Sequence, residues 1–375
     1  MNCKVVSKAE RETFWLSNGD INYDLSGGFG YHVKEVQDAA MEQIQNRVGL
    51  SSRVLLSTPL LQLCETLSTW LGPRYENSYV CNSGDEAFEG ALKLARALNP
   101  GRKTLAYVAH NHYGQMSHGQ LLKPSAAQRE LAAYLGIRII PISTAAELEA
   151  FDAWEDCFAF CHGPFTKTET DQRMFMPLAS INRAQRAASQ HGVLSIYSDL
   201  DTCLGHLGHK LSHTLYGGTP DVIVMGNNLG GGCIPIGTYT TRHELANAVY
   251  GRSSPAKHGS TTAGNPPACV AALAALHFAQ TQSLWNNAAE NGKLIELALQ
   301  EFAPTRFGGW VSLTFANEPH AREVHANLGQ AGFHLSSPEG AELIIRPPLT
   351  ARKEVVSSVA HSILDLLKNA YQKVA

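Results

Sequence analysis

The sequence predicts an α/β fold built on one mainly parallel sheet with helices on both faces. Between about residues 78 and 265, short continuous apolar runs alternate with runs that have the apolar repeat of a helix. Strands that are apolar on both faces belong to buried parallel sheets, and the helices between them cover those faces. The chain has 375 residues, 44% of them hydrophobic and 17% charged, which is a balance typical of a globular protein with a substantial core.

The apolar runs predict six strands, at 77–82, 104–109, 137–142, 157–162, 193–199 and 221–226. Helices are expected between them, at Ser83–Leu98, Ala126–Leu135, Ala145–Trp154 and Leu178–Gln190. A further helix, Pro267–Gln280, leads into an α+β segment that ends in the amphipathic helix Lys353–Ala370. We therefore expect a large α/β domain at residues 51–280, and a small domain made from residues 1–50 and 281–375.

Charge and composition argue against several classes of partner. The formal net charge is −3, so neither nucleic acid nor an anionic membrane surface is expected as a partner. No apolar run reaches the roughly 20 residues that span a bilayer, and the N-terminus lacks a signal-peptide core, so a cytoplasmic protein is expected. The cysteines and histidines at 157, 161 and 162, and at 206, 209 and 213, lack a second ligand pair at defined spacing, and we expect no metal site.

The first segment in which we look for chemistry, Asn82–Arg96, begins a helix just after a strand. A parallel sheet binds ligands at the carboxyl ends of its strands, and the free N–H groups at Ser83 and Gly84 form an anion site. Asp85 follows, either as a built-in anion for this site or as an ordinary helix-capping residue. Both readings disfavour a bound phosphate, because like charges about 4 Å apart repel by about 1 kcal/mol even in water.

This segment resembles the class III (ornithine/acetylornithine/ω-type) aminotransferases, which have Ser-Gly-Thr-Glu-Ala before a similar helix. The resemblance runs from about Gly19 to Leu367 and implies PLP fold type I, with a mainly parallel sheet flanked by helices plus a small α+β domain. It also implies a homodimer, or a heterodimer with an active homologue. The turn at Ser83, Gly84 and Asp85 then corresponds to the phosphate-binding turn of the family, with Asp85 in place of threonine.

Two further segments resemble coenzyme-binding parts of the family. In Ala109–Gly119, His112 takes the place of the aromatic ring that stacks on the pyridine, although a polar loop with satisfied histidines is an equal alternative. After the strand 193–199, Ser198 corresponds to the aspartate that pairs with the pyridinium nitrogen, Leu200 to the residue packed on the ring, and Asp201 to a glutamine near the phenolic oxygen. A serine supplies no negative charge, and the side chain of the adjacent Asp199 is expected on the opposite face of the strand.

The most consequential difference lies after the strand 221–226. Thr219–Gly237 resembles the family segment that carries the Schiff-base lysine, and Asn227 takes the position of that lysine, between Gly226 and Asn228. An amide nitrogen is not nucleophilic, so it cannot form a Schiff base or move the substrate proton. PLP or PMP, if used at all, is therefore not expected to be held as a lysine Schiff base.

Two more family positions lie downstream. Ser260 and Thr261 correspond to the hydroxyl residues that reach the phosphate of the neighbouring subunit, and Arg346 to an arginine that can bind a substrate carboxylate.

Three hypotheses about the function of the chain follow from the sequence. The first is a non-catalytic or repurposed homologue, including a partner subunit of an active relative. The second is an enzyme that holds PLP or PMP without a covalent bond, or that works without coenzyme. The third is an ordinary aminotransferase in which another lysine, Lys210, substitutes.

Overall fold

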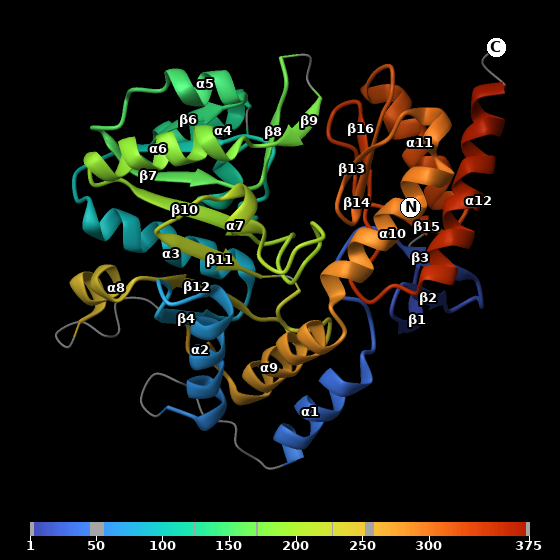
Figure 1. The fold of residues 1–375 in the computed structure, drawn as a ribbon, viewed down its shortest axis with the longest axis horizontal. Coiled ribbons are helices and arrows are strands. Elements are labelled where there is room, and N and C mark those ends of the chain that lie inside the picture. The colour runs from blue at the N-terminus through green and yellow to red at the C-terminus, as the bar shows by residue number, and fades with distance from the viewer. Residues whose placement is uncertain are drawn as a thin grey trace.

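A seven-stranded sheet forms the centre of the larger lobe in the computed structural model, which describes residues 4–45, 56–123, 125–169, 172–226, 228–251 and 259–372 (Figure 1). The strand order is β4-β12-β11-β10-β7-β5-β6. Strand β12 runs antiparallel to both of its neighbours, β4 and β11, and the other neighbouring pairs of this sheet are parallel. The predicted α/β fold with a mainly parallel sheet is confirmed. The strands are β4 (Asn77–Cys81), β5 (Thr104–Val108), β6 (Arg138–Ile142), β7 (Cys157–His162), β10 (Leu194–Asp199), β11 (Val222–Met225) and β12 (Gly237–Thr241).

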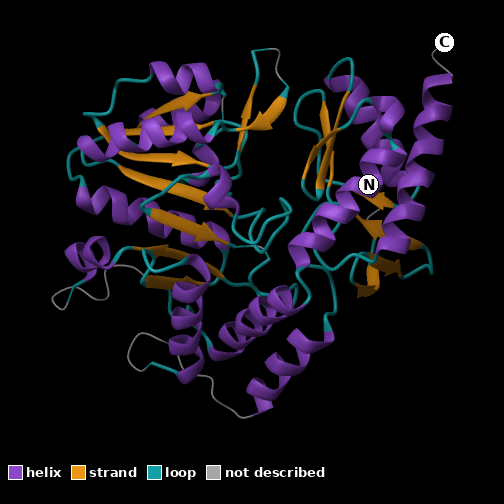
Figure 2. Ribbon diagram, in the orientation of Figure 1, coloured by secondary structure: helices purple, strands orange, loops and turns teal. Residues whose placement is uncertain are grey.

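Helices cover both faces of this sheet, as Figure 2 shows. Alternate side chains of β5 enter two different cores: Leu105 and Tyr107 pack with α3 (Gly84–Leu98), whereas Ala106 and Val108 pack with α5 and α6. This two-sided burial explains why the strands are continuously apolar in the sequence. The other helices of this lobe are α2 (Thr58–Leu71), α4 (Ala126–Tyr134), α5 (Ala145–Ala150), α6 (Leu178–Gln190), α7 (Ser212–Tyr216), α8 (His243–Tyr250) and α9 (Pro266–Thr281).

The helix predicted at Ala145–Trp154 is shorter than expected. It ends at Ala150, and Phe151 has an extended backbone with φ of −71° and ψ of 125°. The Trp154 ring then turns into the core, where it meets the rings of Phe151 and Phe160 edge-on at 4.6 and 5.4 Å. Trp154, which fitted the apolar repeat and so predicted a last turn of helix, is therefore a buried side chain in a loop. The antiparallel strand β12 and the hairpin of β8 (Phe165–Lys167) and β9 (Arg173–Phe175) were not predicted either.

The smaller lobe combines the two ends of the chain. Strand β3 (Ile21–Asp24) pairs in parallel with β15 (Phe333–His334), next to β2 (Thr13–Leu16) and β1 (Val6–Glu10). A second sheet has the order β13-β14-β16, and both contribute to one apolar core with the C-terminal helices. Helix α1 (Lys34–Gln45) instead packs against α9. The remaining elements are α10 (Leu284–Ala298), β13 (Thr305–Phe307), β14 (Trp310–Thr314), α11 (Glu318–Gln330), β16 (Glu342–Ile345) and α12 (Lys353–Gln372). Within the described ranges, no helix is long and apolar enough to cross a membrane.

The β8–β9 hairpin joins the two lobes (Figure 1). The Arg173 side chain on β9 is only 2% exposed, and its Nε donates to both carboxylate oxygens of Glu342 on β16 at 3.0 Å. Its Nη2 donates to Glu339 at 2.6 Å, and its Nη1 to the carbonyl of His110 at 3.0 Å. Phe165 on β8 stacks on Trp310 of β14 at 5.2 Å. A buried ion pair, in which the Arg173 Nε hydrogen is shared by both oxygens of Glu342, and an aromatic contact therefore hold the lobes together.

Replacing Arg173 with methionine is expected to destabilise the protein by about 3–5 kcal/mol, because it leaves Glu342 buried and unpaired. The measurement is the free energy of urea unfolding at pH 7. Arg322→Met on α11 is the matched control, since its ion pair with Glu318 is exposed and is worth less than about 1 kcal/mol. A loss of similar, small size in both variants would contradict the interpretation. Arg173→Met combined with Glu342→Leu should recover most of the loss.

Candidate functional site

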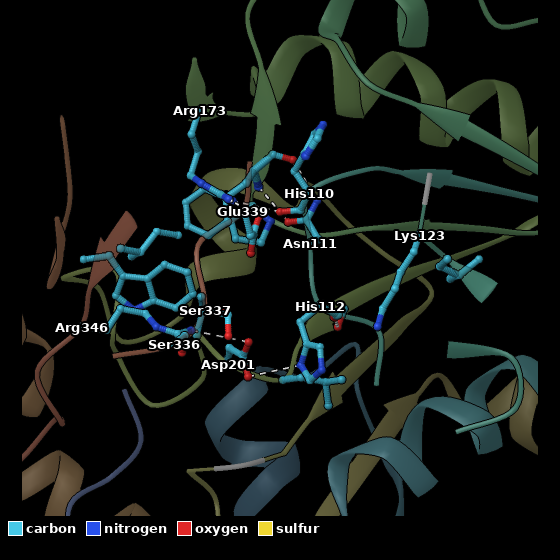
Figure 3. A pocket seen from close by; sticks show the side chains of 18 of the residues that line it. His110, Asn111, His112, Lys123, Arg173, Asp201, Ser336, Ser337, Glu339 and Arg346 are labelled. Atoms are coloured by element: carbon cyan, nitrogen blue, oxygen red, sulfur yellow. Dashed lines mark hydrogen bonds and ion pairs between the residues drawn. The ribbon is translucent and has the colours of Figure 1, made fainter. Parts of the chain in front are cut away.

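A cavity of about 560 Å³ lies between the two lobes. Its larger-lobe wall comes from the loop His110–Gln115 after β5, from Pro164 after β7 and from residues 198–202 at the end of β10. Its smaller-lobe wall includes Trp310, residues 336–339 and Arg346 (Figure 3). The carboxyl ends of three parallel strands thus lie at one cavity. A sheet of this kind binds ligands at the carboxyl ends of its strands.

The end of β10 directs two neighbouring side chains to opposite sides. Ser198 lines the cavity, and its hydroxyl donates to the carbonyl of His112 at 2.5 Å. Asp199 is buried behind the strand, where Oδ1 accepts hydrogen bonds from Thr202 and, at 2.9 Å, from Ser212. The alternation of a strand therefore gives the cavity a hydroxyl here and keeps the adjacent carboxylate out of it.

His112, Asp201 and Arg346 form a charged row across the cavity (Figure 3). His112 Nδ1 lies 3.3 Å from Asp201 Oδ1, and Arg346 Nη1 lies 3.7 Å from Asp201 Oδ2. The Arg346 guanidinium stacks over the Trp310 ring at 4.6 Å and donates to the Ser336 hydroxyl. Leu200 also lines the cavity. The structure thus brings together His112, Ser198, Leu200, Asp201 and Arg346, five of the residues selected from the sequence.

The surroundings of His112 favour its protonated form. Burial lowers the pKa of His112, but the contact with Asp201 and the negative charges of Asp201 and Asp85 outweigh burial and the opposing charge of Arg346. The pKa of His112 is therefore raised above its ordinary value. At the position where the sequence comparison suggested a stacking ring, the cavity therefore has a histidine whose protonated form is favoured by the nearby carboxylates of Asp201 and Asp85.

The N-terminus of α3 lies beside this loop. Ser83 is the N-cap and its Oγ accepts from the backbone N–H of Glu86 at 3.1 Å, so Asp85 is not the capping residue. The Asp85 carboxylate instead accepts from the backbone N–H of Gln115 at 3.0 Å. Gly84 is buried in the first turn. The negative charge of Asp85 therefore faces the His112 loop near the helix N-terminus.

Five of the selected positions that the structure describes do not line the cavity: Ser83, Gly84, Asp85, Ser260 and Thr261. Ser260 is half-buried and Thr261 is exposed, and the next residue, Thr262, donates to Asn82 Oδ1 at 3.0 Å beside the N-terminus of α3. Asn227 lies outside the described residues. It follows Gly226 directly, just beyond β11, whose last residue, Met225, is paired with Asp199 of β10.

Lys210 does not substitute for a cavity lysine. Its Nζ lies 4.1 Å above the ring of Trp70, in a separate groove over α2 and α9. The lysine on the described cavity wall is Lys123, which is exposed and donates from Nζ to Gln115 Oε1 at 3.1 Å. The sequence analysis missed Lys123 because it lies in a loop with no family motif.

Asn111 is a further cavity residue that the sequence analysis missed. Its side-chain amide donates to the carbonyl of Phe165 at 2.9 Å and accepts from the N–H of the same residue at 3.0 Å. A Cβ on Gly163 would lie 2.4 Å from Asn111 Oδ1, so this glycine leaves the space that the asparagine fills. The signal in the sequence was the Gly163-Pro164 pair, which differs from the Glu-Pro of the resembling family.

No metal centre accompanies these residues. The described part of the chain contains no group of three or more His, Cys, Asp or Glu side chains arranged to hold a metal ion. Burial lowers the pKa of His162 to about 3 and the pKa values of His206 and His213 to about 4, which describes neutral core histidines. The seven cysteines in the described ranges form no disulfide bond with one another.

A family model described as aminotransferase class-III matches residues 174–367, just over half of the chain. The chain belongs to the class-III aminotransferase family. Acetylornithine aminotransferase of Streptomyces coelicolor is 25% identical to this family member over 381 residues, which cover 97% of this chain and 90% of the relative.

Solved structures of transaminases share the fold. The ornithine aminotransferase of Toxoplasma gondii ME49 matches with a TM-score of 0.85 and 22% identity, over 99% of this chain and 91% of that one. The amine transaminase of an uncultivated Pseudomonas species, solved in its PLP-bound internal aldimine form, matches with a TM-score of 0.83 and 20% identity, over 97% and 94% of the two chains. The architecture described above is therefore that of the class-III aminotransferases.

Replacing Asp85 with threonine is expected to strengthen the binding of phosphate groups. The change removes a carboxylate near the N-terminus of α3, and one charge pair at about 4 Å is worth about 1–2 kcal/mol in a partly screened site, or roughly 5–30-fold in affinity. The measurement is titration of wild-type and variant protein with PLP and with inorganic phosphate. Glu318→Gln, in the first turn of α11, controls for net charge. Equal affinities in wild type and Asp85→Thr would show that the charge argument is wrong.

Replacing Asp199 with asparagine is expected to remove a pH-dependent loss of stability. Burial raises the pKa of Asp199 from 3.8 to about 6, against the hydrogen bonds from Thr202 and Ser212. The folded protein therefore binds this proton more tightly than the unfolded chain does. Stability associated with this group is complete below pH 3.8 and falls, by about 2–3 kcal/mol in total, as pH rises through the folded pKa.

The asparagine keeps both hydrogen bonds, since both donors bind Oδ1. The free energy of urea unfolding of wild type and Asp199→Asn should be compared at unit steps from pH 4 to pH 8. The advantage of Asp199→Asn should grow with pH and level off above pH 7. A difference that does not change with pH would rule out the buried ionisation.

Proposed function

We propose that this class-III aminotransferase family member does not hold PLP as a lysine Schiff base and is non-catalytic in ordinary transamination, or repurposed. The observation that carries the proposal is the end of β10, where a hydroxyl, Ser198, faces the cavity and the carboxylate of Asp199 is turned away. A pyridinium nitrogen needs a carboxylate partner to remain protonated and to accept electrons during the reaction. A serine hydroxyl bonded to the His112 carbonyl supplies no such charge.

The sequence after β11 supports the same conclusion. Asn227 is our assignment for the Schiff-base position, and the chain has no lysine between Lys210 and Lys257. Without a positioned amine, an aldehyde coenzyme has no covalent attachment, and the effective concentration that an intramolecular lysine provides is lost. The side chain of Lys210 lies on Trp70 in another groove, which argues against the hypothesis of an ordinary aminotransferase that uses it.

The phosphate end of the coenzyme also fits poorly. Asp85 adds a carboxylate next to the helix N-terminus that would receive a phosphate dianion. Ser198 in the cavity therefore does not match the ring nitrogen of PLP, and Asp85 beside it, at the N-terminus of α3, does not match the phosphate. We derive no reaction step through the coenzyme in this chain.

One observation favours an alternative. Lys123 lies on the described cavity wall, so a PLP- or PMP-dependent enzyme of the aminotransferase type, with atypical or non-covalent cofactor binding, is the second candidate. Its substrate would be an amino acid or amine, as the names of the relatives suggest. Lys123 comes from the loop after β5 and not from the strand end at which the family places its lysine.

The assembly is part of the proposal. We expect a homodimer, or a heterodimer in which this chain is the inactive partner of an active homologue and contributes Ser260 and Thr261 to the neighbouring site. Thr261 is exposed and Ser260 is half-buried, and the residue that follows them, Thr262, contacts Asn82 just before the N-terminus of α3. A cytoplasmic location also remains an expectation from the sequence.

The decisive test is borohydride reduction after incubation of the purified full-length chain with PLP. We expect no stoichiometric phosphopyridoxyl adduct by intact-protein mass spectrometry, no absorption band of a protein-bound aldimine, and no amino-acid/keto-acid exchange. The physical reason is that Asn227 supplies no amine. Asn227→Lys alone should also fail, because Ser198 leaves the ring nitrogen unpaired, whereas Asn227→Lys with Ser198→Asp should recover part of the adduct.

Peptide mapping separates the hypotheses. A stoichiometric adduct on Lys123 would overturn the proposal in favour of the atypical enzyme, and Lys123→Gln should then abolish it. Lys103→Gln is a matched control that removes a lysine of the same lobe outside this cavity. An adduct on Lys210 would restore the ordinary aminotransferase.

A further inference from the structure

Asp201 is shared between two cationic side chains from different lobes. One carboxylate oxygen lies 3.3 Å from His112 Nδ1 and the other lies 3.7 Å from Arg346 Nη1 (Figure 3). His112 comes from the loop after β5, and Arg346 comes directly after β16. One carboxylate therefore partly neutralises both cations across the cavity.

The Arg346 side chain is positioned so that it can bind a second anion besides the carboxylate of Asp201. Its guanidinium carbon lies 4.6 Å from the centre of the Trp310 ring, and its side chain is only 14% exposed. In the described structure its Nε is buried without a hydrogen-bond partner, and the contact with Asp201 is longer than a hydrogen bond. A planar guanidinium with unfilled donors, next to the hydroxyls of Ser336 and Ser337, matches the geometry of a carboxylate ligand.

We propose that Asp201 is a built-in competitor for Arg346, and that binding of a small carboxylic acid in this cavity is coupled to uptake of a proton by His112. The proposal rests on the proposed function, in that it concerns a cavity without covalently bound coenzyme. When His112 is protonated, it neutralises Asp201, and Arg346 can bind the ligand carboxylate. When His112 is neutral, Asp201 pairs with Arg346 and repels the ligand.

The direction of the coupling follows from the charges that face His112. Asp201 and Asp85 are negative and Arg346 is positive, and their combined effect with burial already raises the pKa of His112. Further charges of the cavity are Lys123, which reaches Gln115 beside His112, and the mutually paired Arg173 and Glu339. A ligand carboxylate adds negative charge near His112, so it raises this pKa again, and by linkage the protonated protein binds the ligand more tightly.

The cavity size and lining define the ligand class. About 560 Å³ suits a small molecule, and the aromatic rings of Trp310 and Phe165 lie next to the polar groups. The charged residues around the cavity are largely paired with one another, so a single carboxylate on a short body fits better than a phosphate dianion. This argument does not depend on the family role of the arginine. It depends on Asp201, which the family comparison places at a neutral glutamine position.

The test uses the full-length chain without PLP and trifluoroacetate as the probe, because its carboxylate stays ionised over the whole pH range. Binding is followed by ¹⁹F NMR between pH 5.5 and pH 8.5, and the proton of His112 by the NMR shift of its ring hydrogens. We expect the affinity to fall about 10-fold as His112 loses its proton, which corresponds to a pKa increase of about one unit on binding. Equal affinity at pH 5.5 and pH 8.5 would overturn the proposal.

Two substitutions separate the parts of the mechanism. Asp201→Asn should bind the probe about 10-fold more tightly than wild type at pH 8.5, because the competitor for Arg346 has lost its charge. His112→Gln should bind at the weak wild-type pH 8.5 level throughout. His118→Gln is the matched control, since His118 pairs with Glu89 at 2.7 Å on the same segment but outside the cavity, and its binding curve should match wild type.

Other outcomes are equally informative. Unchanged affinity in Asp201→Asn at pH 8.5 would contradict the competitor role even if wild type shows a pH dependence. If the affinity for the probe still depends on pH in His112→Gln, the proton is taken up by another group, and the proposed coupling to His112 is wrong. Failure of the proposed function has a different signature, because a phosphopyridoxyl adduct is detected without any carboxylate probe. The adduct therefore tests the proposed function, and the pH-dependent binding of the probe tests the coupling, independently of each other.

Discussion

The contact of Arg173 with Glu342 and Glu339 is the interaction on which the cavity depends. The cavity walls come from different lobes, and this guanidinium binds the hairpin of one lobe to the sheet of the other. It also donates to the carbonyl of His110, a residue with a left-handed backbone φ of 66° at the start of the His112 loop. A non-glycine residue in this conformation is strained, and persists where its surroundings fix it. The same side chain therefore sets both the separation of the lobes and the path of the loop that carries His112.

Within this frame, the chemistry of the cavity is set by paired charges. His112 and Arg346 flank Asp201, and Arg173 is paired with Glu339 on the same wall. His112, Arg346 and Arg173 each have a carboxylate beside them, whereas Lys123 at the exposed edge of the cavity donates to the side chain of Gln115. The fold of a coenzyme-dependent transferase family is thus combined with a cleft of nearly balanced charge, in which affinity for an anion depends on protonation more than on net positive potential.

The backbone and the side chains of the site have changed to different degrees from the resembling family. Glycines and prolines that allow tight turns after β10 and β11 remain, and the match to transaminase structures extends over nearly the whole chain. In our assignment from the sequence, three side chains at the end of β10 and the start of α3 differ together from the family pattern: Ser198, Asp201 and Asp85. A fold can retain its packing while the groups that act on a ligand are replaced, because packing depends on buried volume and backbone conformation, whereas chemistry depends on a few polar atoms.

The sequence by itself determined the parallel sheet, its helices and the segments at which the cavity forms. Continuous apolar strands alternating with amphipathic helices have few other solutions, and parallel strands bring their carboxyl ends to one edge, so the segments after these strands could be selected without a structure. Within those segments, the resemblance to the class III aminotransferases pointed to His112, Ser198, Leu200 and Asp201. The sequence also indicated that Asp199 would face away from Ser198, because strand side chains alternate with period two.

Only the tertiary structure decided which residues complete the cavity and how its charges are paired. Arg173, Trp310 and Lys123 reach it from a hairpin, from the smaller lobe and from a loop, through contacts that local sequence patterns do not encode. The end of the helix at Ala150 was likewise fixed by packing of the Trp154 ring and not by the apolar repeat. Long-range contacts depend on how the lobes dock, so the pairing of Asp201 with both His112 and Arg346 appears only when the two lobes are placed side by side.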